Sequence, residues 1–125
     1  MKRGSKAKNI LIIDDDPDIV SYLEAAFKNA GYVTSVAYNG QEGLDKVKTA
    51  KPDLITLDMD MPVKSGTLFF ANLRKEAELR DIPVIVISGI GPRPPALTKD
   101  IPTVSKPIDR DHLLNLVAER VSVKP

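Results

Sequence analysis

Asn9-Ile10-Leu11-Ile12-Ile13-Asp14-Asp15-Asp16-Pro17 decides the fold, because an apolar run passes directly into a group of carboxylates. The stretch Leu54-Ile55-Thr56-Leu57-Asp58 repeats this arrangement. Short and almost wholly apolar runs are typical of parallel strands that are buried on both faces. Parallel strands bring their carboxyl ends to one edge of a sheet, and carboxylates gathered there repel one another unless a cation neutralises them. The sequence therefore predicts a site for Mg²⁺ and a phosphate at that edge.

Strands and helices alternate along the chain with short polar links, which indicates a parallel α/β sheet flanked by helices. Asp16 is a typical N-cap followed by a proline, and Asn39 and Asp109 are further caps. We expect strands over Asn9–Asp14, Val33–Ala37, Leu54–Asp58, Pro83–Ser88 and Thr103–Ser105. We expect helices from Asp16 to Gly31, from Asn39 to Pro52, over Gly66–Glu78 and over Asp109–Val121.

Apolar residues recur at helical spacing in each expected helix, and these residues should face the core. They are Ile19, Val20, Leu23, Ala26, Phe27 and Ala30, then Leu44 and Val47, then Leu68, Phe69, Leu73 and Ala77, and finally Leu113, Leu114, Val117 and Val121.

One segment, Gly89–Pro102, interrupts the alternation because it is rich in proline and glycine. Proline prevents a helix longer than about one turn there, although Ala96–Asp100 could form that turn. We therefore expect an extended loop where a five-fold βα repeat has its fourth helix.

The composition is that of one ordered domain, with 125 residues of which 42% are apolar and 28% charged. The net charge of +1 lacks the basic excess of a broad nucleic-acid surface, and no apolar run is long enough for a signal peptide or a membrane span. The absence of cysteine excludes disulfides and fits the reducing cytoplasm. We expect a cytoplasmic domain over residues 9–121, a basic disordered tail over residues 1–8 and a short tail over residues 122–125.

Four of the expected strand ends carry residues that could act together on a phosphoryl group: Asp14 with Asp15, Asp58, Ser88 and Lys106. A carboxylate can attack a phosphoryl group as a nucleophile and form an acyl phosphate. Such a transfer needs charge neutralisation at the phosphoryl oxygens more than proton chemistry, and an ammonium and a hydroxyl at neighbouring strand ends would supply it.

These residues, in this order, resemble the CheY-like receiver domain of bacterial two-component response regulators, over nearly the whole chain. The shared motifs are Asp14-Asp15, the Leu-Asp-Met-Asp-Met-Pro segment around Asp58, Gly66, the strand ending at Ser88, and Lys106-Pro107. The resemblance implies a flavodoxin-like, doubly wound, five-stranded parallel sheet of the (βα)5 type. In this chain the fourth helix would be shortened or replaced by the proline-rich loop.

The resemblance also implies a role for each acidic residue of the cluster. Asp58 would be the phospho-acceptor, and Asp15 and Asp58 would bind Mg²⁺ directly. Asp14 would act partly through a metal-bound water, and Asp60 would lend its backbone carbonyl to the metal. The side chain of Asp60 is expected to be solvated and is given no firm role.

The remaining implied roles concern the phosphoryl group and the partners. Ser88 would donate a hydrogen bond to a phosphoryl oxygen, and Lys106 would pair with the phosphoryl group or with Asp58. Pro107 occupies the position of a family proline that is often cis. The donor would be a sensor histidine kinase or a histidine phosphotransfer protein. The domain itself would not be an enzyme, but a phospho-acceptor that assists its own phosphorylation and dephosphorylation.

Two features depart from the family pattern on its common signalling face. Thr103 stands where the family often has Tyr or Phe, and the Gly89–Pro102 loop stands in place of the fourth helix. We therefore expect phosphorylation to survive and the usual aromatic switch to be lost, with this loop as a hypothetical output element. Output would pass to an unknown protein by contact, without direct binding of nucleic acid or membrane by this domain.

Two alternatives remain open. A receiver-like module that binds its partner without phosphorylation fits the altered face, although the intact acidic cluster argues against it. A Mg²⁺-dependent phosphohydrolase resembling the haloacid dehalogenase superfamily fits Asp58-Met59-Asp60, but that superfamily has its acidic pair late in the chain, whereas Asp14-Asp15 comes first here. His112, the single histidine, is expected on the solvated surface.

Overall fold

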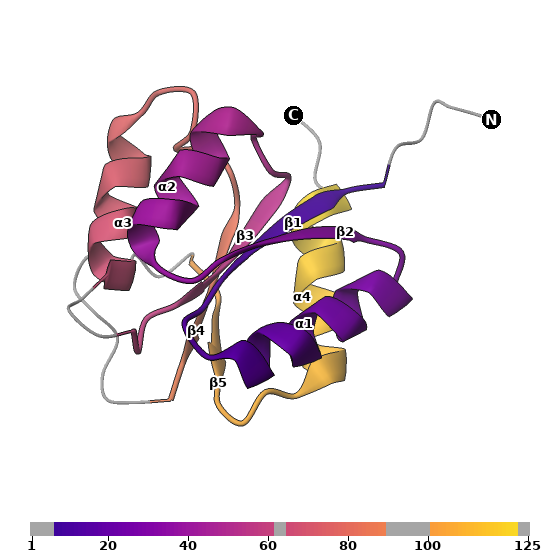
Figure 1. Cartoon of the computed structure of the whole chain (residues 1–125). Coiled ribbons are helices and arrows are strands. Elements are labelled where there is room, and N and C mark those ends of the chain that lie inside the picture. Colours follow the sequence, from indigo (N-terminus) through magenta and orange to yellow (C-terminus); the bar gives the residue numbers. More distant parts are fainter. Residues whose placement is uncertain (1–6, 62–64, 90–100, 123–125) are drawn as a thin grey trace.

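The structure is a computed structural model that describes residues 7–61, 65–89 and 101–122 (Figure 1). Most of the two expected tails, part of the loop expected at Met59–Ser65, most of the Gly89–Pro102 loop and the turn expected at Ala96–Asp100 lie outside the described residues. Within the described residues, none of the helices combines the length and the apolar character needed to cross a lipid bilayer.

The sheet has five strands, which all pair in parallel in the order β2-β1-β3-β4-β5. This is the flavodoxin-like, doubly wound order, and it confirms the predicted fold class. The strands are β1 (Asn9–Ile13), β2 (Val33–Ala37), β3 (Leu54–Asp58), β4 (Val84–Ser88) and β5 (Thr103–Ser105).

Among the residues that the structure describes, four helices cover the two faces of the sheet, with α2 and α3 on one face and α1 and α4 on the other (Figure 1). They are α1 (Pro17–Asn29), α2 (Gly40–Thr49), α3 (Ser65–Lys75) and α4 (Arg110–Ser122), the last of which is the fifth helix of the (βα)5 pattern. In that pattern the fourth helix falls within residues 89–102, which are few in this chain. Three of these residues are described, Gly89, Ile101 and Pro102, and they are not helical.

The expected helix starts are confirmed by their capping contacts. The side chain of Asp16 accepts a hydrogen bond from the Asp18 N–H, and that of Asn39 accepts one from the Glu42 N–H. Asp109 likewise accepts from the His112 N–H at 3.1 Å. Each bond satisfies a donor that the first helical turn leaves unpaired.

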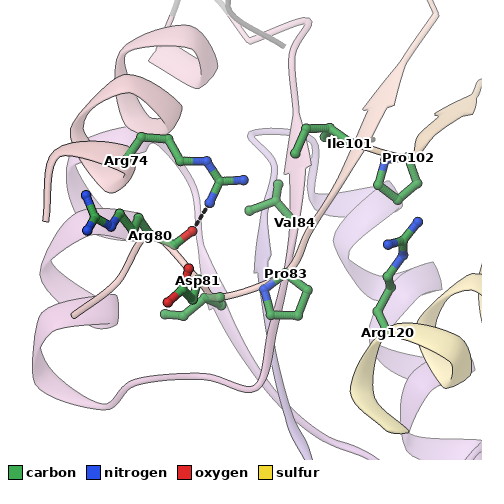
Figure 2. A pocket seen from close by; sticks show the side chains of 9 residues that line it. Arg74, Arg80, Asp81, Pro83, Val84, Ile101, Pro102 and Arg120 are labelled. Carbon is green, nitrogen blue, oxygen red and sulfur yellow. Dashed lines mark hydrogen bonds between the residues drawn. The ribbon is translucent and has the colours of Figure 1, made fainter. Parts of the chain in front are cut away.

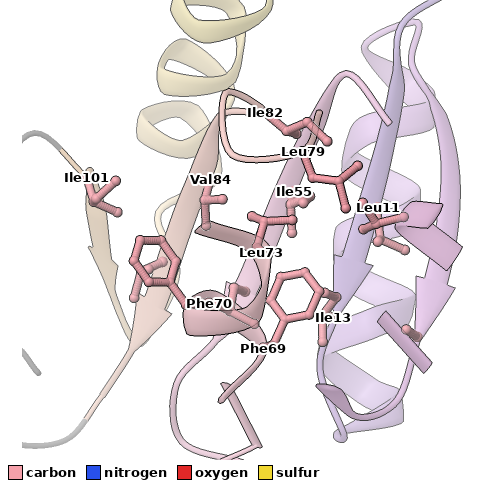
Figure 3. Close-up of a cluster of buried hydrophobic side chains, with 14 of the residues drawn as sticks. Leu11, Ile13, Ile55, Phe69, Phe70, Leu73, Leu79, Ile82, Val84 and Ile101 are labelled. Carbon is pink, nitrogen blue, oxygen red and sulfur yellow. The ribbon is translucent and has the colours of Figure 1, made fainter. Parts of the chain in front are cut away.

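The alternation of side chains along the strands divides the core into two clusters. The cluster beneath α2 and α3 contains Leu11, Ile13, Ile55, Leu57, Val84 and Val86 from the strands (Figure 3). The cluster beneath α1 and α4 contains Ile10, Ile12, Leu54, Ile85, Ile87 and Val104. Because both faces are covered, the central strands read as continuous apolar runs, and their ends are fixed at one edge.

The inward face of α3 differs from the prediction. Phe69 and Leu73 are buried as expected, but Leu68 is 60% exposed and Phe70 is buried in its place. A Cβ at Gly66 would lie 2.7 Å from the Asp58 carbonyl oxygen, so the backbone at Gly66 lies against the end of β3. That contact orients the helix so that positions 66, 69, 70 and 73 face inward, which is the spacing of one helical face.

Two helix ends also differ from the prediction. The helix expected to reach Glu78 ends at Lys75, so Ala77 is exposed, and the buried side chains nearby are Leu79 and Ile82. Ala30 is not inward-facing but is the exposed C-cap of α1, followed by Gly31 at a φ of 98°. Glycine adopts this left-handed conformation without the steric cost of a Cβ.

Candidate functional site

The strand register brings the predicted site residues to one edge of the sheet. Ile13 is paired with Leu57, so Asp14 and Asp58 come next to each other at the carboxyl ends of β1 and β3. Ser88 is paired with Ser105, so Lys106 follows beside the end of β4. The sheet reverses its strand order between β1 and β3, and ligands of doubly wound folds bind at this position.

Backbone groups hold two of the carboxylates in place. One oxygen of Asp14, Oδ1, accepts a hydrogen bond from the Asp16 N–H at 2.9 Å. In the same way, Oδ1 of Asp58 accepts from the Asp60 N–H at 2.9 Å. Both carboxylates are buried, at 1% and 2% exposure, so their positions are fixed by the fold rather than by solvent.

Asp14, Asp15 and Asp58 form a group that suits a hard cation. One oxygen from each of the three lies within 4.8 Å of the others. Within the described part of the chain, Oδ2 of Asp14 is buried and accepts no hydrogen bond. A buried carboxylate oxygen without a donor is costly, and a divalent cation would satisfy it. These residues therefore fit Mg²⁺.

The electrostatics of Asp14 also favour the binding of a cation. Burial, with a smaller contribution from the nearby charge of Asp58, raises the pKa of this carboxyl from 3.8 to about 6. The Asp16 N–H and Lys106 act in the opposite direction and do not offset burial. Two carboxylates in one buried site favour retention of a proton until a positive charge replaces it.

Lys106 places a positive charge between two carboxylates. Its Nζ lies 3.2 Å from Oδ1 of Asp58 and 3.2 Å from Oδ2 of Asp60. Although burial favours the neutral amine, the negative charges of Asp58 and Asp60 and their hydrogen bonds hold the pKa of Lys106 above its usual value. Lys106 is therefore a fixed ammonium beside Asp58, and its peptide bond to Pro107 is cis.

Sequence reasoning missed the side chain of Asp60, which is partly buried and not simply solvated. Its carboxylate accepts hydrogen bonds from Ser88 Oγ at 3.1 Å and from the Gly89 N–H at 2.8 Å, in addition to its ion pair with Lys106. Burial works to raise the pKa of Asp60, but these three partners together hold it below its usual value. Asp60 thus contacts two residues predicted to meet a phosphoryl group.

Only a weak signal in the sequence could have indicated this contact. Asp60 follows the strand end by two residues, so its side chain can reach across to the end of the neighbouring strand. Gly89 allows the approach, because a Cβ there would lie 3.2 Å from the Cβ of Lys106. The sequence places these residues near each other but does not indicate which carboxylate accepts from the serine.

Comparison with known families shows which family the chain belongs to. The family model of the response regulator receiver domain matches residues 10–118. The chain belongs to this family. Receiver domains are components of two-component signalling. The residues by which the sequence resembles this family lie together at one site in this receiver domain.

Individual proteins agree with the family assignment. Protein Rrf1 of Nitratidesulfovibrio vulgaris is 31% identical over 86% of this receiver domain and 78% of its own length. The transcriptional regulatory protein PrrA of Mycobacterium leprae is 36% identical over 70% of the chain, but the match covers only 37% of PrrA. A crystal structure described as a putative response regulator from Chloroflexus aurantiacus matches 94% of this chain and all of its own with a TM-score of 0.85, and at 22% identity it supports the fold alone.

The positions that depart from the family pattern are also visible in the structure. Thr103 is exposed at the start of β5, so the edge strand has no aromatic side chain at this position. His112 is exposed near the start of α4 and lies outside the cluster of site residues. The carboxyl edge of the sheet thus keeps the family pattern, whereas the neighbouring face differs from it at Thr103 and in the short region that follows β4.

Proposed function

We propose that this receiver domain accepts a phosphoryl group on Asp58 in a Mg²⁺-dependent step and thereby acts as the switch of a two-component phosphorelay. The observation that carries the proposal is the arrangement of one ammonium and three carboxylates. Asp14, Asp15 and Asp58 offer oxygens within 4.8 Å of one another, and Lys106 Nζ lies 3.2 Å from Asp58. This arrangement matches the requirement of phosphoryl transfer for positioning and charge neutralisation.

Asp58 is the nucleophile of the proposed reaction. Its Oδ1 is held by the Asp60 N–H and by Lys106, so we assign the attack to Oδ2. The new bond joins this oxygen to phosphorus while the P–N bond of a phosphohistidine donor breaks. The bonding electrons remain on the imidazole nitrogen, which is protonated as the donor leaves, and Asp58 becomes an acyl phosphate.

The other residues stabilise the charge that the phosphoryl group brings. Asp14, Asp15 and Asp58, with the backbone carbonyl of Asp60, would hold Mg²⁺, which when bound neutralises phosphoryl oxygens. Lys106 contributes an ammonium on the other side of Asp58, and Ser88 contributes a hydroxyl donor once it leaves Asp60. Hydrolysis of the acyl phosphate, with water as the nucleophile at phosphorus, returns Asp58 to its carboxylate.

The proposal includes the partners expected from the sequence. The donor is a sensor histidine kinase or a histidine phosphotransfer protein in the cytoplasm, and output passes by contact to a further protein. The domain is a phospho-acceptor that assists its own modification, not an enzyme that turns over free substrates. Exposed Thr103 favours an output route that does not rely on a switching aromatic residue.

Intact mass spectrometry tests the proposal. The protein is incubated with acetyl phosphate and Mg²⁺, and the same incubation is performed with Asp58→Asn and with chelator in place of Mg²⁺. We expect a gain of about 80 Da, the mass of one phosphoryl group, in the wild type with Mg²⁺ and in neither control. An adduct that persists in Asp58→Asn would contradict the assignment of the acceptor.

Some receivers accept phosphate only from their kinase, so the absence of an adduct with acetyl phosphate can have two causes. A second ligand distinguishes an unsuitable phosphate donor from a site that does not accept phosphate. If acetyl phosphate gives no adduct, beryllofluoride with Mg²⁺ should still raise the melting temperature of the wild type and not that of Asp58→Asn. Failure of both would leave a receiver-like module that binds its partner without phosphorylation. Steady turnover of a generic phosphate ester would instead support the phosphohydrolase alternative.

A further inference from the structure

A second polar site lies at the amino-terminal edge of the sheet, opposite the acceptor site. A cavity of about 350 Å³ opens where β4 and β5 begin, between the end of α3 and the end of α4. Pro83, Val84, Ile101 and Pro102 contribute apolar walls (Figure 2). A volume of this order falls within the usual range of small-molecule sites, which begins at roughly 300 Å³.

The charged residues around this cavity are mostly of one sign. Arg74, Arg80 and Arg120 line it together with one acidic residue, Asp81. The whole chain has a net charge of only +1, so this excess is local. Three guanidinium groups around one space repel one another, and an anion bound among them would remove that repulsion.

The side chain of Arg120, a residue of α4, has an unsatisfied hydrogen-bond donor. Its Nε is buried and has no hydrogen-bond partner in the described part of the chain. Figure 2 shows its guanidinium pointing from the helix towards Pro102, across the space from the other two arginines. An arginine cannot escape this cost by losing its proton, so an acceptor from outside the chain would satisfy the group.

Arg74 and Arg80 form the opposite wall. Arg74 stacks on the ring of Phe70, with 4.6 Å between its Cζ and the ring centroid, and its Nη1 donates to the carbonyl oxygen of Arg80. These contacts hold the turn that carries Arg80 and Asp81. Neither Arg80 nor Arg120 forms an ion pair with an acidic side chain among the described residues.

We propose that this cavity is a binding site for a small oxyanion, a molecule bearing two or more phosphate or carboxylate groups. Arginine presents paired N–H donors in a planar fork that matches both kinds of group. The two walls hold arginines on opposite sides, so a ligand with two charged groups bridges them while its body lies against Val84 and Ile101. The site is separate from Asp58 and does not depend on phosphorylation.

Titration by two-dimensional NMR tests the site directly in the 13.7 kDa protein. Pyrophosphate and citrate are added separately, without Mg²⁺ and with chelator present, so that the acceptor edge binds neither. We expect saturable shifts at the amides of Arg80, Asp81, Val84, Ile101 and Arg120, and not at Asp14 or Asp58. A response to pyrophosphate alone assigns the site to phosphate groups, and a response to citrate alone assigns it to carboxylates.

Substitutions at the cavity distinguish a built site from general attraction to basic residues. Arg120→Gln should weaken binding by about tenfold or more, whereas Arg110→Gln, an exposed arginine at the other end of the same helix, should leave it within about twofold. If Arg120→Gln fails to fold, Arg80→Gln at an exposed position provides the same comparison.

Three outcomes would overturn the proposal. The first is no shift at these amides with either anion up to about 10 mM, where even millimolar affinity is visible. The second is shifts spread over surface lysines, which would indicate an adventitious ion only. The third is binding that Arg120→Gln and Arg80→Gln, both folded, weaken no more than Arg110→Gln does.

Discussion

The two edges of this sheet gather charges of opposite sign, and they do so by different structural means. At the carboxyl edge, Asp14 and Asp58 stand on strand ends, and each accepts a hydrogen bond from a backbone N–H two residues further on. At the amino edge, long side chains from α3, a turn and α4 surround a cavity. Short side chains fixed by backbone suit a reaction that requires one geometry. Long guanidinium side chains suit a ligand whose exact shape matters less.

Of the changes considered, replacement of Lys106 should have the largest effect on phosphorylation at the carboxyl edge. Lys106→Gln deletes the ammonium that lies 3.2 Å from both Asp58 and Asp60. We expect the rate of phosphorylation by acetyl phosphate to fall by about 100-fold, since preorganised charge is worth this much in transfer reactions. Arg120→Gln, which removes a cation from the other edge, should leave the rate unchanged. An undiminished rate in folded Lys106→Gln would show that this charge has no part in the transfer.

Binding of Mg²⁺ should distinguish the two edges, because we expect only the carboxyl edge to bind it. A ligand of the folded state raises the free energy of unfolding by about 2.7 kcal/mol at a hundredfold excess over its Kd. We expect Mg²⁺ to raise the melting temperature of the wild type and Asp15→Asn to lose most of this gain. Asp81→Asn at the amino edge is the matched control. An equal shift in Asp15→Asn would place the metal elsewhere.

The protonation of Asp14 should be measurable in the absence of Mg²⁺. Because the pKa of Asp14 is raised from 3.8 to about 6, the folded state holds this proton over a pH range in which the unfolded state has lost it. The contribution of Asp14 therefore lowers the free energy of unfolding as the pH rises from about 4 to about 6, by on the order of 2 kcal/mol.

Chemical denaturation of the wild type and Asp14→Asn across this pH range isolates the effect. The amide cannot titrate, so the variant should gain stability relative to the wild type as the pH rises, and it should be the more stable protein at pH 7. A difference that stays constant with pH would mean that Asp14 is already ionised at low pH in the folded protein.

The smallest effect is expected at Asp60, which shares Lys106 and Ser88 with the proposed phosphoryl group. Asp60→Asn removes a negative charge beside the acceptor while the amide oxygen can still accept from the Gly89 N–H. We expect the phosphorylated fraction at steady state to rise by about two- to fivefold, because one like charge is removed from the site. Asp53→Asn, an exposed carboxylate that accepts from the Asn9 N–H at the other edge, should not change it. A fall in the phosphorylated fraction would mean that Asp60 positions the two donors productively.

The fold and the gathering of Asp14, Asp15 and Asp58 at one edge could be predicted because they depend on local patterns. Apolar strands ending in Asp14 and Asp58 specify both the sheet and the edge where its carboxylates gather, and the caps Asp16, Asn39 and Asp109 specify where helices start. Each of these signals lies within a few consecutive residues.

The features that could not be predicted depend on contacts between distant residues. The inward face of α3 depends on the approach of Gly66 to the end of β3. Because helical spacing alone does not contain this contact, the sequence predicted that Leu68 is buried, whereas the structure buries Phe70. The role of the Asp60 carboxylate needs Ser88 and Gly89 from another strand end. The arginine cavity combines a helix, a turn and another helix, and Arg120 is far from Arg74 and Arg80 in the sequence, so no local pattern indicates that they meet.

The central claim is that Asp58 alone, among the carboxylates of this edge, carries the phosphoryl group. Reduction with borohydride after incubation with acetyl phosphate and Mg²⁺ converts an aspartyl phosphate to homoserine, and peptide sequencing by mass spectrometry then locates it. We predict homoserine at position 58 and unmodified aspartate at positions 14, 15 and 60. Homoserine at any of those three positions, with Asp58 unchanged, would contradict the account.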